Sequence, residues 1–406
     1  MGALWHGFAD MGAVERDGAF VVCRGEGPYI WDAPGNRYLD ATGGLWFANV
    51  GHGRKEIGAA VAEQIGRLAH YSNFGDFASD TTIALAERLA AIAPVPGSKI
   101  FFTSGGSDSI DSAVKLARRY WHEVGKPAKT IVVGRTQAYH GMHVAGTALA
   151  GIPANRDGYG EFMPDARTID RNDAKALLEL IEEIGADRIA AFFCEPIIGA
   201  GGIYPPPAGY LAEVRQICRD HEILFVADEV VTGFGRIGGS WFAASRFGLE
   251  PDLMTTAKGL TSGYVPMGAV FVAPTVAEPF FGGAWFRHGY TYGGHAGAAA
   301  AAMANLDIIE RESLLDESKR LEASLDRFLA PLAEHRAVVE VRSGVGAVAG
   351  VQLADMSTAL AFVKVARGHG VSTRAAGVGA LQFSPAFVTT DEQVAEMADA
   401  VRKALG

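Results

Sequence analysis

The stretch that decides the fold is KIFFTSGGSDSIDSAVKLARRYWHEV, residues 99–124. It opens with a short apolar run, turns at two glycines and a serine, and continues with apolar residues three and four positions apart. The first part predicts a strand, and the last part predicts a helix. Strand, turn and helix in this order form the unit from which helix-covered parallel sheets are built.

The same unit recurs along the chain to about residue 273. Short, continuously apolar runs predict further strands within TIVVG (130–134), RIAAFFCEP (188–196), ILFVADEVV (223–231), DLMTTAK (252–258) and PMGAVFVA (266–273). Such runs suit a sheet buried on both faces, whereas half-exposed strands alternate apolar and polar residues. We therefore predict an α/β fold with a mostly parallel central sheet covered by helices.

The two ends of the chain share a different pattern. Short alternating runs predict strands at 20–24, 28–32 and 37–40. Beyond residue 294, a long helical pattern is followed by strand signals in VVEVRSGVGAVAGVQL (338–353) and by a last helix. We expect the two ends to pack together as a smaller, discontinuous α+β domain. The predicted division is 1–46 and 294–406 for the small domain and 47–293 for the large domain.

The composition excludes several classes of protein. The 406 residues carry 46 acidic and 36 basic side chains, a net charge of -10, so no basic footprint for nucleic acid is present. No run is long and apolar enough to cross a membrane, and the first residues do not resemble a signal peptide. Cys23, Cys194 and Cys218 lack the spacing of a zinc site or a disulfide framework. We expect a cytoplasmic protein without a metal.

The turn within the opening stretch is a candidate anion site. Gly105, Gly106 and Ser107 stand between the predicted strand and helix. The first backbone N–H groups of a helix have no partner within it, and together with the helix dipole they bind anions such as phosphate. Glycines let such a group come close to the backbone. The alternative is an ordinary helix start capped by Ser107 or Asp108.

Two residues at strand ends are candidates to hold a flat aromatic ring. Tyr139, in AYHGM, could stack on such a ring, and its alternative is an ordinary place in the core. Asp228 ends the run ILFVAD, where a buried carboxylate needs a partner such as a protonated ring nitrogen. The sequence GxGxxG follows at Gly233, Gly235 and Gly238. Two acidic residues precede it and it lies in mid-chain, which argues against a dinucleotide site.

Three further residues could bind anions or react with carbonyl groups. Lys258 follows the apolar run LMTTA, and burial there would lower its pKa and free its amine to form a Schiff base. Arg374, in STRAAGVG, could bind a carboxylate in a planar fork. Thr291, in YTYGGHAG, could donate its hydroxyl to an anion. The alternatives are a solvated lysine, a surface arginine and a closely packed helix start.

Together these candidates suit one cofactor, pyridoxal 5'-phosphate (PLP), a phosphorylated aldehyde on a pyridine ring. The chain resembles the class III aminotransferases, PLP enzymes of fold type I, and within them the ω-amino acid and amine:pyruvate transaminase branch. The resemblance runs from about Arg37 to Thr390. It rests on segments in the family's order: DATGGLWFANVGHGRKEI, TSGGSDSIDSAVKLARRY, AYHGM, CEPIIGAGG, ADEVVTGFGRIG, TTAKGL, YTYGGHAGAAAA and the segment Arg374–Pro385.

The resemblance implies a role for each matching residue. Lys258 would bind the PLP aldehyde, and Asp228 would keep the pyridine nitrogen protonated. Thr291 would reach the phosphate in the neighbouring subunit, which implies a homodimer with shared active sites, and a tetramer stays open. The further cofactor-binding residues would be Gly105, Gly106, Ser107, Tyr139, His140, Glu195 and Val230, with Tyr139 and Val230 on the two ring faces. The substrate would contact Leu45, Trp46, Tyr139, Ala200 and Arg374.

Two departures from the family pattern are informative. Family members that use 2-oxoglutarate carry a Glu five residues after the Glu of a Glu-Pro pair, where it masks the carboxylate-binding arginine. Here Glu195-Pro196 is followed by Ala200, so nothing acidic is expected to mask Arg374. This favours pyruvate over 2-oxoglutarate as the amino acceptor. The phosphate turn has Gly105 where the family more often has a serine, so one hydroxyl is missing.

The prediction is a PLP-dependent transaminase that moves an amino group from an ω-amino acid or amine to a keto acid, with pyruvate expected. The mechanism would be ping-pong, with Lys258 as general base and acid. A racemase or decarboxylase on the same fold is the main alternative, because it would share the cofactor residues. A nicotinamide oxidoreductase would leave Lys258 unexplained. A non-catalytic regulator would need a DNA-binding segment, for which no sequence is left.

Overall fold

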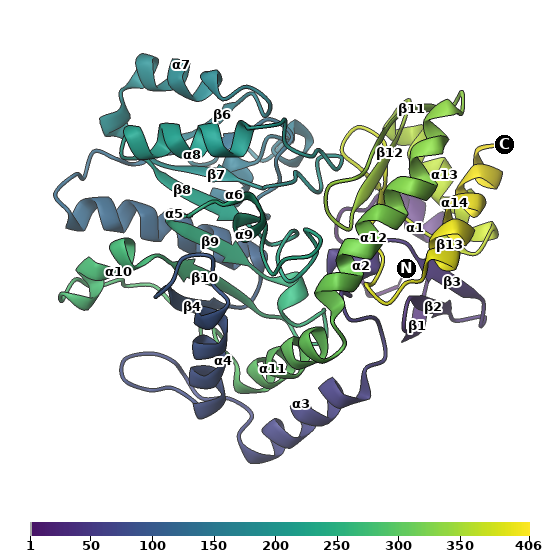
Figure 1. The fold of residues 1–406 in the computed structure, drawn as a ribbon, viewed down its shortest axis with the longest axis horizontal. Helices are drawn as coiled ribbons and strands as arrows, with labels where there is room; N and C mark the ends of the chain where they lie inside the picture. The colour runs from purple at the N-terminus through teal and green to yellow at the C-terminus, as the bar shows by residue number, and fades with distance from the viewer. Residues whose placement is uncertain (1) are drawn as a thin grey trace.

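A computed structural model describes residues 2–406 and places a seven-stranded sheet at the centre of the larger part of the molecule (Figure 1). The strand order is β4-β10-β9-β8-β7-β5-β6, and β10 alone runs antiparallel to its two neighbours. The predicted mostly parallel sheet is therefore confirmed. The strands are β4 (Lys99–Thr103), β5 (Ile131–Arg135), β6 (Ala166–Ile169), β7 (Ile189–Cys194), β8 (Leu224–Asp228), β9 (Leu253–Thr256) and β10 (Gly268–Val272).

The strands are continuously apolar because both faces of this sheet are covered. Successive residues of a strand point to opposite faces, so Phe192 and Phe193 enter two different core clusters. The helix α5 (Gly106–Glu123) packs against one face with its apolar side, and α8 (Tyr210–Asp220) packs against the other. The carboxyl ends of the parallel strands are thereby fixed at one edge, where ligands of such sheets bind.

The remaining helices of the first 311 residues include several that the sequence analysis did not assign. The patterns at 53–69 and 79–93 form α3 (Lys55–Arg67) and α4 (Asp80–Ala91). Unassigned were α1 (Met11–Asp17), α2 (Gly43–Trp46), α6 (Val144–Leu149), α7 (Lys175–Ile184), α9 (Ala243–Phe247) and α10 (Pro274–Phe281). Most of these are too short to show a clear helical period. The helix α11 (Ala296–Arg311) packs on α3 and α4.

The two ends of the chain build two further sheets at one side of the molecule (Figure 1). One has the order β1-β2-β3-β13 and the other β11-β12-β15-β14. Strand β13 (Val371–Ser372) pairs in parallel with β3 (Arg37–Asp40), so both ends contribute to one sheet. The other elements are β1 (Val22–Glu26), β2 (Tyr29–Asp32), α12 (Leu314–Leu329), β11 (Val338–Arg342), β12 (Ala349–Leu353), α13 (Met356–Gly368), β14 (Ala375–Ala376), β15 (Ala380–Phe383) and α14 (Asp391–Leu405).

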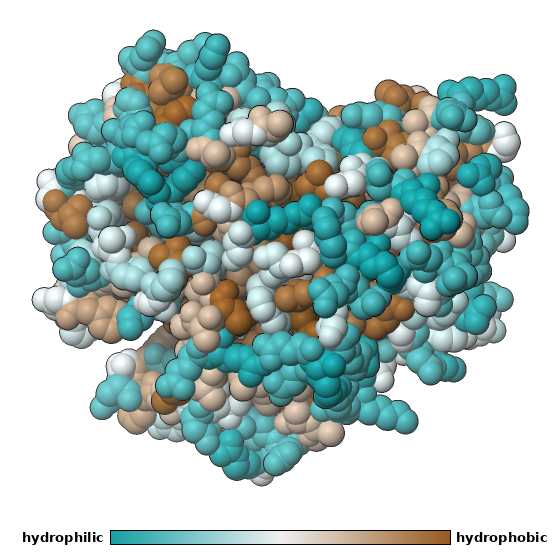
Figure 2. Space-filling model, in the orientation of Figure 1, coloured by the Kyte–Doolittle hydropathy of each residue, from teal (hydrophilic) through white to brown (hydrophobic). Residues whose placement is uncertain are grey.

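The surface is mainly hydrophilic on the face drawn in Figure 2, with apolar residues gathered toward the middle of the view. Within residues 2–406, no helix is long and apolar enough to cross a membrane. The domain boundaries at 46/47 and 293/294 stay predictions.

Candidate active site

The predicted phosphate turn is the start of α5, and its first backbone N–H groups are not capped by a side chain. Gly105 has extended backbone geometry, and no side chain caps the helix that begins at Gly106. Ser107 Oγ accepts a hydrogen bond of 3.1 Å from the backbone N–H of Met142. Because that bond uses an acceptor position, the hydroxyl hydrogen of Ser107 is free to donate to an anion. The first turn of α5 therefore offers both backbone and hydroxyl donors.

Glycines bring two neighbouring segments against this turn. A Cβ on Gly106 would lie 2.9 Å from Val230 Cγ1, and one on Gly141 would lie 2.8 Å from the Cα of Ser107. Both distances are shorter than a normal contact, so side chains at these two positions would displace Val230 or the turn. Val230 and the loop after Tyr139 are thus fixed beside the candidate phosphate site.

Asp228 lies at the carboxyl end of β8 and is almost fully buried. Its Oδ2 lies 2.8 Å from Nδ1 of the fully buried His140, whose N–H donates to the carboxylate. Its Oδ1 accepts from the backbone N–H of Val230 at 3.1 Å and lies 3.3 Å from the Thr255 hydroxyl. These bonds hold the carboxylate in one orientation and leave acceptor capacity for a protonated nitrogen.

Glu195 holds the backbone of Tyr139 in place. Its Oε1 accepts from the backbone N–H of Tyr139 at 2.8 Å, and its Oε2 accepts from the N–H of Gly199 at 3.0 Å. Burial raises the pKa of this carboxyl, opposed by His140. Burial also raises the pKa of the half-buried Tyr139. Glu195 therefore acts on the site through the backbone of its neighbours.

Lys258 lies two residues after the last residue of β9 and has a positive φ of 38°. Burial lowers the pKa of its amine to about 8, against the opposing effect of Asp228 and Glu195. A fraction of the amine is therefore uncharged near neutral pH, which a nucleophile or general base requires. Its Nζ lies 5.3 Å from the centre of the Trp46 ring.

Arg374 approaches the same ring from another element. Its Cζ lies 5.3 Å from the centre of the Trp46 ring, and no side chain among residues 2–406 forms a hydrogen bond or ion pair with its guanidinium. Burial lowers the pKa of Arg374 from its ordinary value. A half-buried guanidinium without an acid partner is costly, and a substrate carboxylate would satisfy it.

The other predicted residues occupy distinct places. Trp46 is buried, Leu45 is exposed and Ala200 is half-buried. The backbone carbonyl of Ala200 accepts from the N–H of Gly377, which places it beside the Arg374 segment. Thr291 is exposed at the surface, where its carbonyl accepts from His70 Nε2 at 2.8 Å. Its hydroxyl forms no hydrogen bond with any of the described residues.

The segment that spells GxGxxG has no helix at its start. Residues 230–240 form turns after β8, and Gly235 and Gly238 have φ values of 93° and 87°. The adjacent Glu229 is fully buried and accepts from the backbone N–H groups of Ala243 and Ala244. Burial raises the pKa of Glu229 to about 7. The three glycines therefore do not lie at a helix start, where a dinucleotide site would need them.

The sequence analysis missed residues that act on the site through others. Met142 and Thr255 support Ser107 and Asp228, as described above. The first turn of α5 also contains Asp108, whose Oδ1 lies 2.7 Å from Nε2 of His143. No local signal marks such pairs, because their members are 27 or more positions apart.

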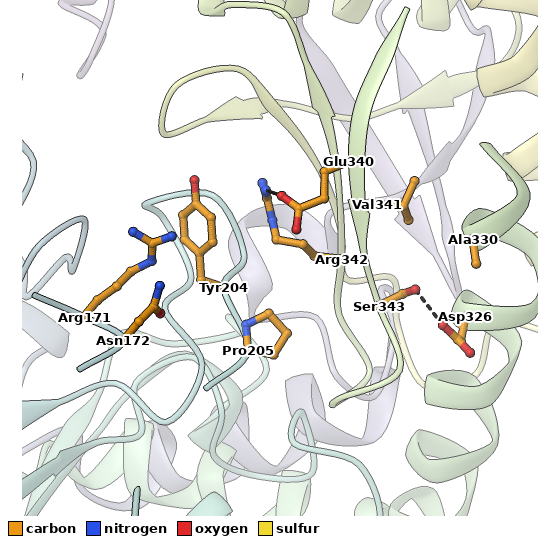
Figure 3. Close-up of a pocket in the computed structure, with 10 residues that line it drawn as sticks. All are labelled: Arg171, Asn172, Tyr204, Pro205, Asp326, Ala330, Glu340, Val341, Arg342 and Ser343. Atoms are coloured by element: carbon orange, nitrogen blue, oxygen red, sulfur yellow. Dashed lines mark hydrogen bonds and ion pairs between the residues drawn. The ribbon is translucent and has the colours of Figure 1, made fainter. Parts of the chain in front are cut away.

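A cavity of about 460 Å³ lies elsewhere, between β11 and two loops of the larger part (Figure 3). The guanidinium groups of Arg171 and Arg342 each lie about 4 Å from the ring centre of Tyr204. Arg342 already donates to the carbonyl of Gly202 and to the side chains of Gln352 and Glu340. None of the predicted site residues lines this cavity, so it is separate from the candidate active site.

The residues around Lys258 fit PLP on structural grounds. They supply an amine with a lowered pKa, a fixed carboxylate at a strand end and an uncapped helix start, and they leave Arg374 unpaired. A mostly parallel sheet that presents these groups defines a PLP-dependent enzyme of fold type I.

Comparison with known proteins gives the family. The family described as "Aminotransferase class-III" matches residues 11–405, and the chain belongs to this family. It is 38% identical to the putrescine–pyruvate aminotransferase of Pseudomonas aeruginosa, over 98% of this chain and 93% of the relative. It is 36% identical to the beta-alanine–pyruvate aminotransferase of the same organism, over 99% of this chain and 95% of the relative.

Solved structures of transaminases have the same fold as this chain. A transaminase from the marine bacterium Virgibacillus superposes with a TM-score of 0.95 at 36% identity, covering 99% of this chain and 96% of the other. An (S)-enantioselective omega-transaminase from Thermomicrobium roseum gives 0.95 at 36% identity, covering 98% and 95%. The protein is a PLP-dependent class III aminotransferase, and a racemase or decarboxylase is not favoured.

Proposed function

We propose that the protein transfers an amino group from an ω-amino acid or amine to pyruvate in a ping-pong reaction. The observation that carries this proposal is the unpaired guanidinium of Arg374 beside Lys258 and Trp46. Ala200 stands where the family's 2-oxoglutarate enzymes carry the masking glutamate, so the arginine stays open to a small keto acid. The names of the pyruvate-dependent relatives support the same acceptor.

The proposed site residues divide the chemistry between them. When bound, PLP supplies an aldehyde that accepts the amino group and a ring that withdraws electrons. Asp228 would accept a hydrogen bond from the ring nitrogen, and the backbone N–H groups of Gly105, Gly106 and Ser107, with the Ser107 hydroxyl, would hold the phosphate. Lys258 Nζ takes a proton from the substrate carbon that carries the amino group and returns a proton later in the cycle.

Tyr139 and Val230 would restrain the ring of bound PLP. His140 and Glu195 hold Asp228 and the backbone of Tyr139 in place. Trp46 and Leu45 bound the substrate pocket, with Tyr139 and Ala200 on its other sides. Arg374 orients the acceptor's carboxylate through paired hydrogen bonds.

The experiment follows the two half-reactions separately by absorbance. We expect a panel of amines to bleach the visible band of the purified protein and pyruvate to restore it. In Arg374→Leu, the rate of restoration by pyruvate should fall about ten- to a hundredfold, because a hydrogen bond to a charged group contributes roughly 1.5–3 kcal/mol. Bleaching by an amine without a carboxylate should change less than about threefold.

Ala200→Glu is the matched variant, because the added carboxylate would pair with Arg374 and slow pyruvate in the same direction. A protein that PLP cannot colour, or one whose colour pyruvate never restores, would contradict the proposed function.

A homodimer with shared active sites is part of the proposal. Thr291 is exposed, and large apolar side chains are exposed near it in sequence at Phe281, Trp285 and Tyr292. Such side chains favour burial against another subunit. We expect sedimentation to give twice the chain mass of 42.8 kDa, or four times for a tetramer, and a monomer at micromolar concentration would contradict it. A cytoplasmic location is proposed from the three unpaired cysteines.

A further inference from the structure

The short segment α2, which carries Leu45 and Trp46, has non-helical backbone angles at Gly44 and Leu45 and forms a strained turn. Gly43, Gly44 and Trp46 have φ values of 52°, 66° and 60°. A residue with a Cβ rarely adopts the last of these values, so the surrounding structure must hold Trp46 in place. A Cβ on Gly44 would lie 2.2 Å from the Phe47 ring, and one on Gly43 would lie 2.7 Å from the carbonyl oxygen of Ser384. The turn is therefore closely packed on both sides.

One buried carboxylate, that of Asp40, holds this turn. Asp40 ends β3 and is 3% exposed. Its Oδ2 accepts from the backbone N–H of Gly44 at 2.6 Å. Its Oδ1 accepts from the backbone N–H of Thr42 at 3.2 Å and lies 3.1 Å from the Thr42 hydroxyl. The carboxylate thus satisfies backbone groups that the irregular turn leaves without partners.

His52 fixes the orientation of that carboxylate. Its Nε2 lies 2.8 Å from Asp40 Oδ2, so the imidazole N–H donates to the oxygen that also holds Gly44. Backbone hydrogen bonds in both directions tie His52 to Gly27. A Cβ on Gly25 would lie 2.7 Å from the Cβ of His52, so the imidazole is packed against β1. His52 is thereby anchored independently of the turn.

Asp40 also stands where the two substrate-facing segments meet. In the sheet it pairs with Ser372, which lies two residues before Arg374. The N–H of Ala41 donates to the carbonyl of Ser372 at 2.9 Å. Trp46, at the other end of the turn, lies 5.3 Å from both the Lys258 amine and the Arg374 guanidinium, measured to the ring centre. A shift at Asp40 is transmitted to the aromatic wall between these two groups.

We propose that Asp40 and His52 are positioning residues for the substrate pocket, which hold the strained turn so that Trp46 stays between Lys258 and Arg374. The inference rests on the proposed function, since it assigns Trp46 to the substrate. It predicts that loss of the His52 hydrogen bond weakens binding of the amine donor and leaves PLP binding intact.

The test is a double-mutant cycle between His52 and Trp46. We expect His52→Leu to lower kcat/KM for a preferred amine about tenfold, mainly through KM, with less than a twofold change in the dissociation constant of PLP. In a Trp46→Ala background the same substitution should change kcat/KM less than twofold, because the residue that it positions is gone. His52→Gln, which keeps an N–H donor on the side chain, should recover most of the loss.

A second measurement does not depend on turnover. Hydrogen–deuterium exchange of the peptide that contains Gly44 should become at least tenfold faster in His52→Leu than in the wild type, while a peptide from β8 keeps its rate. Three results would each overturn the inference. They are a loss of kcat/KM on His52→Leu that is the same in both backgrounds, a loss of PLP affinity as large as the loss of kcat/KM, and unchanged exchange at Gly44. If no amine bleaches the wild-type protein, the proposed function fails on its own. The exchange measurement then still decides whether His52 holds the turn.

Discussion

Replacement of Lys258 by alanine is expected to lower kcat at least about 10⁴-fold, because the proposed mechanism assigns both the nucleophile and the general base to this one side chain. Burial already lowers the pKa of this amine to about 8, and no other lysine among residues 2–406 lies at the end of a central strand beside Asp228. The purified variant should lose the visible band that covalent attachment of PLP to Lys258 would give. Absorbance spectra and single-turnover kinetics with an amine check both expectations.

Lys258→Arg is the matched control for charge. An arginine keeps a positive group in place but stays protonated at any accessible pH, so it neither attacks a carbonyl nor accepts a proton. Its activity should therefore be as low as that of Lys258→Ala. Addition of a small primary amine should restore part of the proton transfer to the alanine variant, which has room for it, and not to the arginine variant. Turnover of Lys258→Ala at an appreciable rate without added amine would refute the assignment of Lys258.

The residues that could be predicted from the sequence are those at the ends of buried strands. Asp228 and Lys258 each follow a short run without charged residues, and the structure places both at the carboxyl edge of the sheet. A polar residue directly after such a run is a strong local signal, since a charged group near a core needs a partner. The alternating strand and helix pattern likewise predicted the mostly parallel sheet, because burial on both faces requires continuously apolar strands.

The supporting residues could not be predicted in this way. His52 reaches Asp40 across 12 positions, Tyr139 reaches Glu195 across 56, and His140 reaches Asp228 across 88. Periodicity indicates which face of an element is buried, but it does not indicate which polar groups meet once the elements pack.

The position of α11 shows the same limit. Its small residues predicted a helix, and only the structure shows that it packs on α3 and α4. The two ends of the chain were predicted to form one domain because their sequence patterns are similar. The pairing of β3 with β13 supports that prediction, and the exact boundaries are untouched by it.

Asp228→Asn is expected to lower kcat about 10²- to 5 × 10³-fold, the equivalent of the roughly 3–5 kcal/mol that follows loss of one member of a buried ion pair. In the wild type, Nδ1 of His140 lies 2.8 Å from Asp228 Oδ2. The amide oxygen of the asparagine can accept the same hydrogen bond, so the fold and the neighbouring contacts should survive. What is lost is the negative charge that, in the proposed function, would keep the ring nitrogen of PLP protonated. Without it the ring withdraws fewer electrons, and removal of the substrate proton by Lys258 becomes slow.

The deuterium isotope effect on the bleaching half-reaction separates this role from a structural one. If Asp228 acts through the ring, an amine deuterated at the reacting carbon should show a larger isotope effect in Asp228→Asn than in the wild type, because proton removal then limits the rate. Thr255→Val, which removes the 3.3 Å contact to Oδ1 and keeps the charge, should lose less than about tenfold and keep the wild-type isotope effect. An Asp228→Asn variant that loses only PLP affinity, at an unchanged rate when saturated, would assign the carboxylate to binding alone.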